Sequence, residues 1–264
     1  QSILIAGNYP RLNLVAALWA HQKKRSLYYL SDSNVLDLKN INRSFINKVI
    51  LRILFSWVTK FLVIGKRNQD FYIDICGLSS IANRAHHFPL PHLSYVFESV
   101  QPKHSSECFS FLVLGRLVEQ KSVDHAIRAF SKLEKKDQLI SKLIIAGDGP
   151  LKPTLEKLVK SLGVEERVVF LGSVPSGKTS EVYENADAVI VPSSQEPWGL
   201  VVNEALSSAR PVITSSRVGS CPDLVQNGIT GLVLENNSPE SIKNAMKYCL
   251  DHPDEIKKIG LAGR

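Results

Sequence analysis

The second half of the chain alternates between short apolar runs and segments with helical periodicity. The apolar runs are FSFLVL (109–114), KLIIA (142–146), RVVFL (167–171), AVIVP (188–192), PVIT (211–214) and GLVL (231–234). Between them, apolar residues recur on one helical face, as at Val123, Ile127 and Phe130. The runs are continuous rather than alternating, so both faces of each strand are expected to be buried. This pattern predicts parallel βαβ units in a layered α/β structure.

The first part of the chain follows a shorter version of the same pattern. Strands are predicted at SILIAG (2–7), SLYYL (26–30) and FLVIG (61–65), and a helix from about Arg43 to Lys60. Three strands are too few to close a doubly wound sheet. The first strand follows directly on Gln1, which is not a methionine. We therefore expect the natural N-terminus to lie upstream.

The stretch from about Asn83 to Glu107 separates the two parts. It contains three prolines and four histidines, has neither period, and is predicted to be a linker. No helical or strand spacing fixes the geometry of the histidines, so they are not expected to bind a metal; they are His86, His87, His92 and His104. We predict an incomplete α/β domain over residues 1–95 and a nearly complete one over residues 96–264.

Positive charge is concentrated in the first hundred residues. They carry 12 Lys and Arg against 5 Asp and Glu, whereas residues 101–264 carry 20 of each kind. A localised basic surface favours an anionic partner such as a membrane or an acidic substrate. In the predicted helix Arg43 to Lys60, one face is apolar: Phe45, Ile46, Val49, Ile50, Ile53, Leu54, Trp57 and Val58. We prefer a helix packed on the sheet with a basic edge, and a helix lying on anionic lipid is the alternative.

Composition indicates a soluble globular protein. Hydrophobic residues make up 44% and charged residues 22% of the chain. The four cysteines are scattered, which predicts free thiols in a reducing compartment rather than disulfides or a zinc site. We expect a cytoplasmic protein, with a peripheral position at the inner membrane face as the variant that the basic region suggests.

Two glutamates mark the start of a predicted helix. The stretch EPWGLVVNEA (196–205) follows the buried strand AVIVP and places Glu196 eight residues before Glu204. A helix that begins at the carboxyl end of a parallel strand offers free backbone N–H groups and a positive dipole end to a phosphate. Both carboxylates can face one crevice and accept hydrogen bonds from vicinal diols. The alternative is a solvated helix start whose acidic residues match the dipole.

Two cations follow the first strand of this half. Arg116 and Lys121 lie in GRLVEQK (115–121), before a helix expected from about Ser122. Two cations at the mouth of a sheet can clamp a pyrophosphate and offset the charge of a leaving nucleoside diphosphate. Surface solvation is the alternative. Gly147 opens the turn GDGP after KLIIA, which by itself indicates only a tight turn.

The segment GSVPSGKT (172–179) satisfies the pattern G-x4-G-K-[ST] of a phosphate-binding loop between a strand and a helix. Taken alone it would suggest an ATPase or GTPase. The helix that follows has little room before NADAVIVP, and Pro175 removes one backbone donor from the loop. Both features count against a P-loop, so a P-loop NTPase is kept only as the alternative function.

In order and spacing, GRLVEQKS, AGDGP, EPWGLVVNEA and NGITGLVLE resemble the nucleotide-binding half of GT4-type retaining glycosyltransferases with a Glu-x7-Glu motif. The first part is similar to the later portion of the family's acceptor-side domain. The resemblance implies a GT-B fold of two Rossmann-like domains, the N-terminal one incomplete, in a chain cut short at both ends. The family's first glycine-rich loop and its last crossing helix have no counterpart. Where many relatives carry a histidine, this chain has LSDSN (30–34), which leaves the role of Asp32 open.

The resemblance also implies roles for the matched residues. Arg116 and Lys121 would bind the donor diphosphate, Glu196 the donor sugar near its reacting carbon, and Glu204 the ribose. Backbone amides of Gly199, Leu200 and Val201 would hold phosphate or sugar, and the base would be bordered by Gly147, Gly172 and Pro175. No metal and no cofactor is implied, because the two cations supply the charge that a metal would give.

The implied activity is transfer of a sugar from a nucleoside diphosphate-sugar, with retention of configuration. The acceptor is a saccharide, a lipid-linked molecule or a small molecule that the sequence does not identify, and no nucleic-acid partner is expected. Because the donor-facing loop of the first domain is missing, this chain is expected to bind nucleoside diphosphate better than it turns over a donor. A non-catalytic nucleotide-binding fragment or pseudoenzyme is a further alternative.

Overall fold

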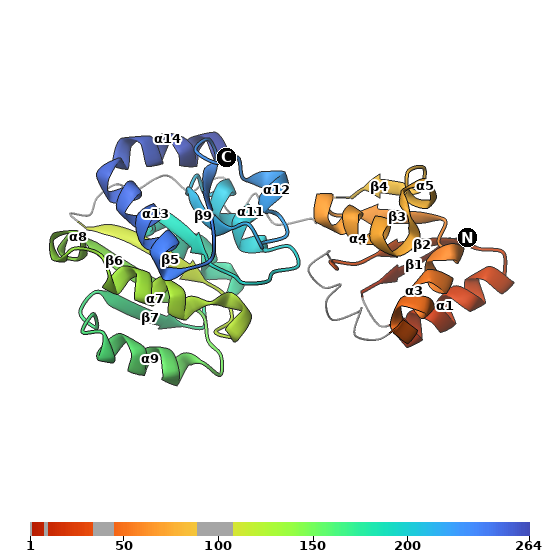
Figure 1. Cartoon of the computed structure of the whole chain (residues 1–264), viewed down its shortest axis with the longest axis horizontal. Coiled ribbons are helices and arrows are strands. Elements are labelled where there is room, and N and C mark those ends of the chain that lie inside the picture. The colour runs from red at the N-terminus through yellow and green to blue at the C-terminus, as the bar shows by residue number, and fades with distance from the viewer. Residues whose placement is uncertain (1, 8–9, 34–44, 89–107) are drawn as a thin grey trace. The chain divides into compact units, whose positions relative to one another are not determined.

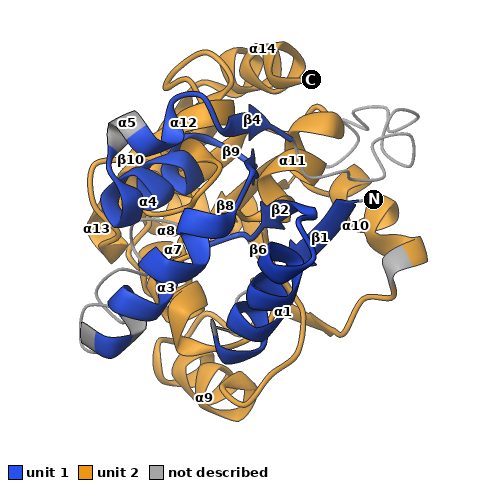
Figure 2. Ribbon diagram, turned by 90° about the vertical axis from the view of Figure 1, so that its right-hand side faces the viewer, with its two compact units in different colours: residues 1–91 blue, residues 92–264 orange. Residues whose placement is uncertain are grey.

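The computed structural model describes residues 2–7, 10–33, 45–88 and 108–264 (Figure 1). Internal contacts divide the chain into two compact units, residues 1–91 and residues 92–264 (Figure 2). Each unit is built around its own parallel β-sheet, with four strands described in unit 1 and six in unit 2.

Unit 1 arranges its described strands in chain order, β1-β2-β3-β4. The strands are β1 (Ser2–Ala6), β2 (Ser26–Leu30), β3 (Lys60–Val63) and β4 (Ala85–His87). The described helices are α1 (Pro10–Gln22), α3 (Phe45–Trp57), α4 (Lys66–Cys76) and α5 (Leu78–Ile81). The three predicted strands and the predicted helix are confirmed.

The predicted linker is wrong at its start, because β4 lies within the predicted range and belongs to unit 1. His86 and His87 pair in register with Leu62 and Val63 of β3. A strand of three residues is too short for its period to show in the sequence. The later part of the predicted linker, with His92 and His104, lies outside the described residues.

The core of unit 1 lies on one face of its sheet. Alternate strand residues, among them Leu27, Tyr29 and Phe61, are buried in one cluster with side chains of α1, α3 and α4. On the opposite face, Leu4 is 55% exposed and Tyr28 is half-buried. Right-handed crossovers between parallel strands taken in chain order place their helices on the same side, which accounts for the single covered face.

Unit 2 orders its strands β10-β9-β8-β5-β6-β7, all parallel. The strands are β5 (Phe109–Leu114), β6 (Ser141–Ala146), β7 (Val168–Gly172), β8 (Ala188–Val191), β9 (Val212–Ser215) and β10 (Gly231–Leu234). The helices are η2 (Glu119–Lys121), α7 (Val123–Ser131), α8 (Lys135–Leu139), α9 (Lys152–Ser161), η3 (Ser176–Lys178), α10 (Thr179–Glu184), α11 (Leu200–Ser207), α12 (Cys221–Leu224), α13 (Pro239–Asp251) and α14 (Pro253–Gly263). Each predicted apolar run of this half forms a strand, which confirms the prediction of parallel βαβ units.

Successive residues of the central strand β5 enter two different cores. Phe111 and Val113 pack with α7, α9 and α13, which Figure 1 shows around this sheet, whereas Leu112 packs with residues of α10 and α11. The strands of unit 2 are therefore buried on both faces, as their continuous apolar runs predicted.

The strand order of unit 2 reverses between β5 and β8. From β5 the chain proceeds through β6 to β7 at one edge, and from β8 it proceeds through β9 to β10 at the other. In open α/β sheets, ligands bind outside the carboxyl ends of the strands at such a switch point. A ligand is therefore expected to bind at the loops after β5 and β8.

Within the ranges that the structure describes, no helix has the length and apolar character needed to cross a bilayer. All four cysteines are free thiols, as predicted; they are Cys76, Cys108, Cys221 and Cys249.

Candidate functional site

The loops that follow β5 and β8 meet at the switch point. Lys121, at the end of η2, forms an ion pair with Oε2 of Glu196, and the same oxygen accepts a hydrogen bond from Ser193 Oγ (3.3 Å). The two paired side chains are only 25% and 15% exposed. A backbone hydrogen bond from Ser194 N to Gln120 O (2.8 Å) joins the two loops. The structure therefore brings one predicted cation and the first predicted glutamate into direct contact.

The turn that carries Glu196 is braced by the loop after β9. Gly219 N donates to Glu196 O (3.0 Å), and Ser220 N donates to Trp198 O (2.9 Å). A Cβ on Gly219 would lie 1.8 Å from the carbonyl oxygen of Pro197. Only glycine permits this approach. Gly219 belongs to none of the predicted motifs, and its position shortly after a buried strand is the one signal that the sequence carries.

Gly199 forms the entry to α11. Its φ of 89° lies in the left-handed region, and an added Cβ would lie 2.8 Å from Cγ1 of Val218. Trp198 is 8% exposed and donates from Nε1 to Asn203 Oδ1 (2.9 Å), which holds the turn against the first turn of the helix. The predicted amide donors Gly199, Leu200 and Val201 thus stand where a helix leaves its first N–H groups without intrahelical partners.

Glu204 lies on α11 and contacts α10. Its Oε2 accepts a hydrogen bond of 2.7 Å from the hydroxyl of Tyr183, which is fully buried. Burial, together with the Glu204 charge, raises the pKa of Tyr183 well above its ordinary value of 10. Glu196 and Glu204 therefore have different partners. Sequence reasoning missed Tyr183, because a buried tyrosine on a helix face looks like any other core residue.

Glycines close the ends of β5, β6 and β7. Gly115 N donates to Ala146 O (2.9 Å), and Gly147 N donates to Gly172 O (2.7 Å). A Cβ on Gly147 would lie 1.9 Å from Gly115 O, so Gly147 serves the packing of two loops. Gly172 has a φ of 71° and no atom within 4 Å of an added Cβ, so the space beside it is open.

The remaining predicted cation and the phosphate-loop pattern lie at the surface. Arg116 is exposed, and it forms no ion pair with any residue that the structure describes. In GSVPSGKT, Lys178 uses its backbone N–H to bond Pro175 O (2.8 Å), and the helix that follows, α10, has six residues. A phosphate-binding loop must offer its N–H groups to the anion. This geometry does not favour a P-loop.

Asp32 follows β2 at the carboxyl edge of the unit 1 sheet and is exposed. Its neighbours Ser31 and Ser33 are buried, and both of their carbonyl oxygens accept hydrogen bonds from Asn68 Nδ2 (3.0 and 2.6 Å). Asn68 Oδ1 in turn accepts from Ile64 N (3.1 Å). This buried asparagine, which the sequence analysis did not single out, ties the loops after β2 and β3 together.

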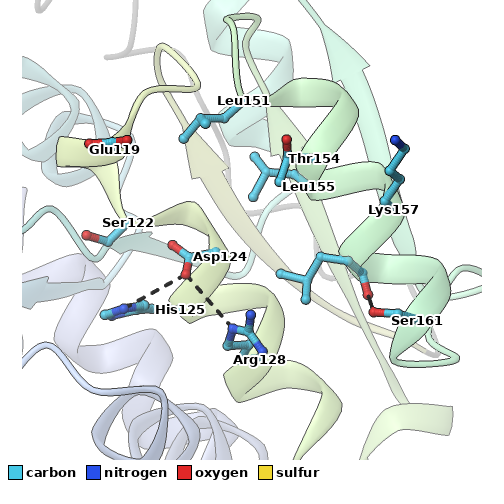
Figure 3. A pocket seen from close by; sticks show the side chains of 11 residues that line it. Glu119, Ser122, Asp124, His125, Arg128, Leu151, Thr154, Leu155, Lys157 and Ser161 are labelled. Carbon is cyan, nitrogen blue, oxygen red and sulfur yellow. Dashed lines mark hydrogen bonds and ion pairs between the residues drawn. The ribbon is translucent and has the colours of Figure 1, made fainter.

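A separate cavity of about 550 Å³ lies between α7 and α9 (Figure 3). Leu151, Leu155 and Leu158 line it together with the α7 residues Asp124, His125 and Arg128. None of the predicted site residues lines this cavity. In the described ranges, no group of three or more His, Cys, Asp or Glu residues is placed to hold a metal ion.

Comparison with known proteins places these motifs in a family. The model of the family "Glycosyl transferases group 1" matches residues 97–264. An uncharacterized glycosyltransferase of Methanocaldococcus jannaschii is 38% identical over 131 residues, which are 50% of this chain and 33% of that protein. A D-inositol 3-phosphate glycosyltransferase of Corynebacterium glutamicum is 36% identical over 152 residues, 56% of this chain and 36% of that protein. The chain spans about a third of the length of these relatives.

Solved structures resemble almost the whole chain. An Anabaena protein, HepE, in complex with UDP-glucose has a TM-score of 0.76 at 19% identity, over 98% of this chain and 72% of that one. Sucrose-phosphate synthase from Thermosynechococcus elongatus has a TM-score of 0.80 at 20% identity, over 98% of this chain and 67% of that one. At such low identity the likeness establishes the fold, and it confirms the predicted GT-B arrangement of two parallel α/β sheets.

Proposed function

The chain belongs to the group 1 glycosyltransferase family, and we propose that the whole protein transfers a sugar from a nucleoside diphosphate-sugar to an acceptor with retention of configuration. The observation that carries this proposal is the contact between Lys121 and Glu196 at the switch point, on the turn that opens α11. A cation, a carboxylate and a helix N-terminus at the switch point of the sheet supply the contacts that a diphosphate and sugar hydroxyls need.

The proposed site residues contact different parts of the donor. When the bond between the anomeric carbon and the diphosphate oxygen breaks, Lys121 and Arg116 offset the negative charge on the leaving group. Glu196 faces the positive charge that develops on the sugar ring. The acceptor hydroxyl bonds to the same face of the anomeric carbon, and its proton passes to the departing diphosphate. Glu204 receives the ribose hydroxyls throughout.

Amides and glycines complete the proposed donor site. Backbone N–H groups of Gly199, Leu200 and Val201 bind phosphate or sugar oxygens at the start of α11. The base lies beside Gly172 and Pro175, where the space next to Gly172 is open. Gly147 contributes by holding the neighbouring loop in place. Like the UDP-bound and UDP-glucose-bound Anabaena structures that share the fold, this protein would use a nucleotide-sugar donor.

Calorimetric titration with UDP, GDP, ADP, ATP and GTP tests this function. We expect one nucleoside diphosphate to bind, and Lys178→Met to leave that binding unchanged, because the Lys178 side chain is exposed and the proposed site assigns it no contact with the nucleotide. Binding of ATP or GTP alone, lost in Lys178→Met, would instead support the P-loop alternative. Release of the same diphosphate from matching sugar donors separates an enzyme from a pseudoenzyme, which would bind without turnover.

We also propose that unit 1 touches an anionic membrane from the cytoplasmic side. Helix α3 does pack on the sheet, but through Leu51, Leu54 and Phe55, which are buried. Of the apolar face predicted from the sequence, Ile46 and Ile53 are 68% and 44% exposed, so that part of the helix prediction is wrong. The spacing of apolar residues along a helix does not show which part of the apolar face packs on the sheet.

Helix α1 adds to this exposed surface. Leu12, Val15 and Trp19 of α1 are 68%, 65% and 52% exposed. The two helices pack together, and the rings of His21 and Trp57 stack at 5.3 Å between centroids. Arg11 of α1 and Arg52 of α3 are also exposed. Exposed apolar and basic side chains on the same two helices match the chemistry of an anionic lipid surface.

Co-sedimentation with lipid vesicles tests the membrane contact. We expect binding to phosphatidylcholine vesicles only when phosphatidylglycerol is added, and loss of that binding at high salt. Val15→Asp should weaken it roughly tenfold, since a buried valine contributes about 1.5 kcal/mol or more. Leu139→Asp is the matched control, because Leu139 is 58% exposed in unit 2. Equal binding by the two variants would contradict the proposal.

A further inference from the structure

We propose that Tyr183 is the positioning residue for Glu204: its hydroxyl holds the carboxylate in the orientation that receives the ribose hydroxyls. This inference rests on the proposed function, because a ribose reaches Glu204 only if the protein binds a nucleoside diphosphate. It assigns a role to a buried polar group outside every motif recognised in the sequence.

The geometry of the pair restricts how Glu204 can move. The Tyr183 hydroxyl lies 2.7 Å from Glu204 Oε2. The tyrosine ring belongs to the apolar cluster that contains Leu112, Val189 and Ala205, and the whole residue has no exposed surface. A ring packed at the density of a protein core cannot follow a moving carboxylate. Moving the carboxylate away would break this hydrogen bond, so the contact favours the orientation that the hydroxyl sets.

The chemistry of the pair suits a permanent brace. Burial raises the pKa of Tyr183 well above 10, so near neutral pH the hydroxyl always carries its proton and always donates. A carboxylate has two oxygens with about four acceptor positions, and the tyrosine occupies one of them on Oε2. A carboxylate that is already oriented loses less entropy when a vicinal diol binds to it.

The same contact links the ribose side of the site to the base side. Tyr183 lies on α10, which begins at Thr179 and follows η3 and the loop that contains Gly172 and Pro175. Asp187, just beyond α10, anchors the segment on β5 through its Oδ2, which accepts from Ser110 N (2.8 Å). The segment GSVPSGKT thus leads from the proposed base-binding loop into the helix that braces Glu204, in place of the phosphate cradle that its pattern suggested.

A nucleotide pair that differs only in the ribose tests this role. The nucleoside diphosphate that binds best and its 2′,3′-dideoxy counterpart are titrated calorimetrically into the wild-type protein and Tyr183→Phe. We expect the variant to bind the ribose form roughly 5- to 10-fold more weakly, the effect of one hydrogen bond to the ribose that the unheld carboxylate no longer makes, and the dideoxy form within about twofold of wild type. In a Glu204→Gln background, Tyr183→Phe should add no further loss.

Tyr72→Phe is the matched control. Tyr72 is another fully buried tyrosine, its hydroxyl lies 3.2 Å from Ser31 Oγ, and it belongs to unit 1. This variant should keep wild-type affinity for both nucleotides. Equal weakening of both nucleotides by Tyr183→Phe, or no weakening of either, would overturn the positioning role while the proposed function stands. A wild-type protein that binds no nucleoside diphosphate would overturn both.

Discussion

Replacing Glu196 by glutamine is expected to lower kcat by about 10²–10³ while the affinity for free nucleoside diphosphate stays close to that of the wild type. Glu196 lies against Lys121 and Ser193 at the switch point, with 15% of its side chain exposed. Positive charge develops on the sugar only as its bond to the diphosphate loosens, so a carboxylate there stabilises the transition state more than the bound donor. Free diphosphate contains no sugar and should not detect the change.

Donor hydrolysis in the natural full-length protein provides the measurement, followed as release of nucleoside diphosphate at saturating donor. Glu204→Gln is the matched comparison. It makes the same chemical change on α11, the helix that the turn of Glu196 opens. It should weaken diphosphate and donor alike by about 1–3 kcal/mol and raise KM more than it lowers kcat. If both variants had the same kinetic signature, the separate roles of the two glutamates would be refuted, and the fold would be unaffected.

The strands of unit 2 could be predicted because each is a continuous apolar run bounded by polar residues. Burial on both faces leaves no alternation, and the segments between the runs have the length and period of helices. The strand β4 escaped prediction because Ala85–His87 carries two exposed histidines and too few residues for any period. The exposed apolar face of α3 escaped prediction for a different reason: a helical stripe shows that a face exists but not what covers it.

The sequence allowed the residues of the candidate site to be selected, but it did not predict which of them contact one another. Loops that follow parallel strands gather at one edge of a sheet, which is why Arg116, Lys121 and Glu196 could be selected. The contact between Lys121 and Glu196 depends on β5 lying beside β8, and the sequence pattern does not specify strand order. Tyr183 contacts Glu204 through a hydrogen bond, and Gly219 permits a close backbone approach to Pro197. The sequence surroundings of both are those of ordinary core and turn residues.

The ion pair at the switch point makes Lys121 the second position where a large effect is expected. Its ammonium group pairs with Glu196 and is 25% exposed. A donor diphosphate bound at the switch point would meet this cation at the end of η2, and the negative charge of the diphosphate would grow as the sugar leaves. Lys121→Met keeps most of the side-chain length and removes the charge. Under the proposed function, the variant would therefore lose a contact to both the bound diphosphate and the leaving group.

Lys121→Met should weaken nucleoside diphosphate binding by about 1.5–3 kcal/mol, the range for a hydrogen bond to a charged group. It should also lower kcat/KM for donor hydrolysis by about 10²–10³, because the same cation stabilises the departing diphosphate. This joint loss differs from Glu196→Gln, which should spare diphosphate binding. Lys178→Met, made at an exposed lysine of the same unit, should change neither quantity by more than about twofold. Unchanged diphosphate affinity in Lys121→Met would show that this residue does not bind the diphosphate. An equal loss in Lys178→Met would show that the effect comes from the overall charge of the unit and not from a specific contact of Lys121.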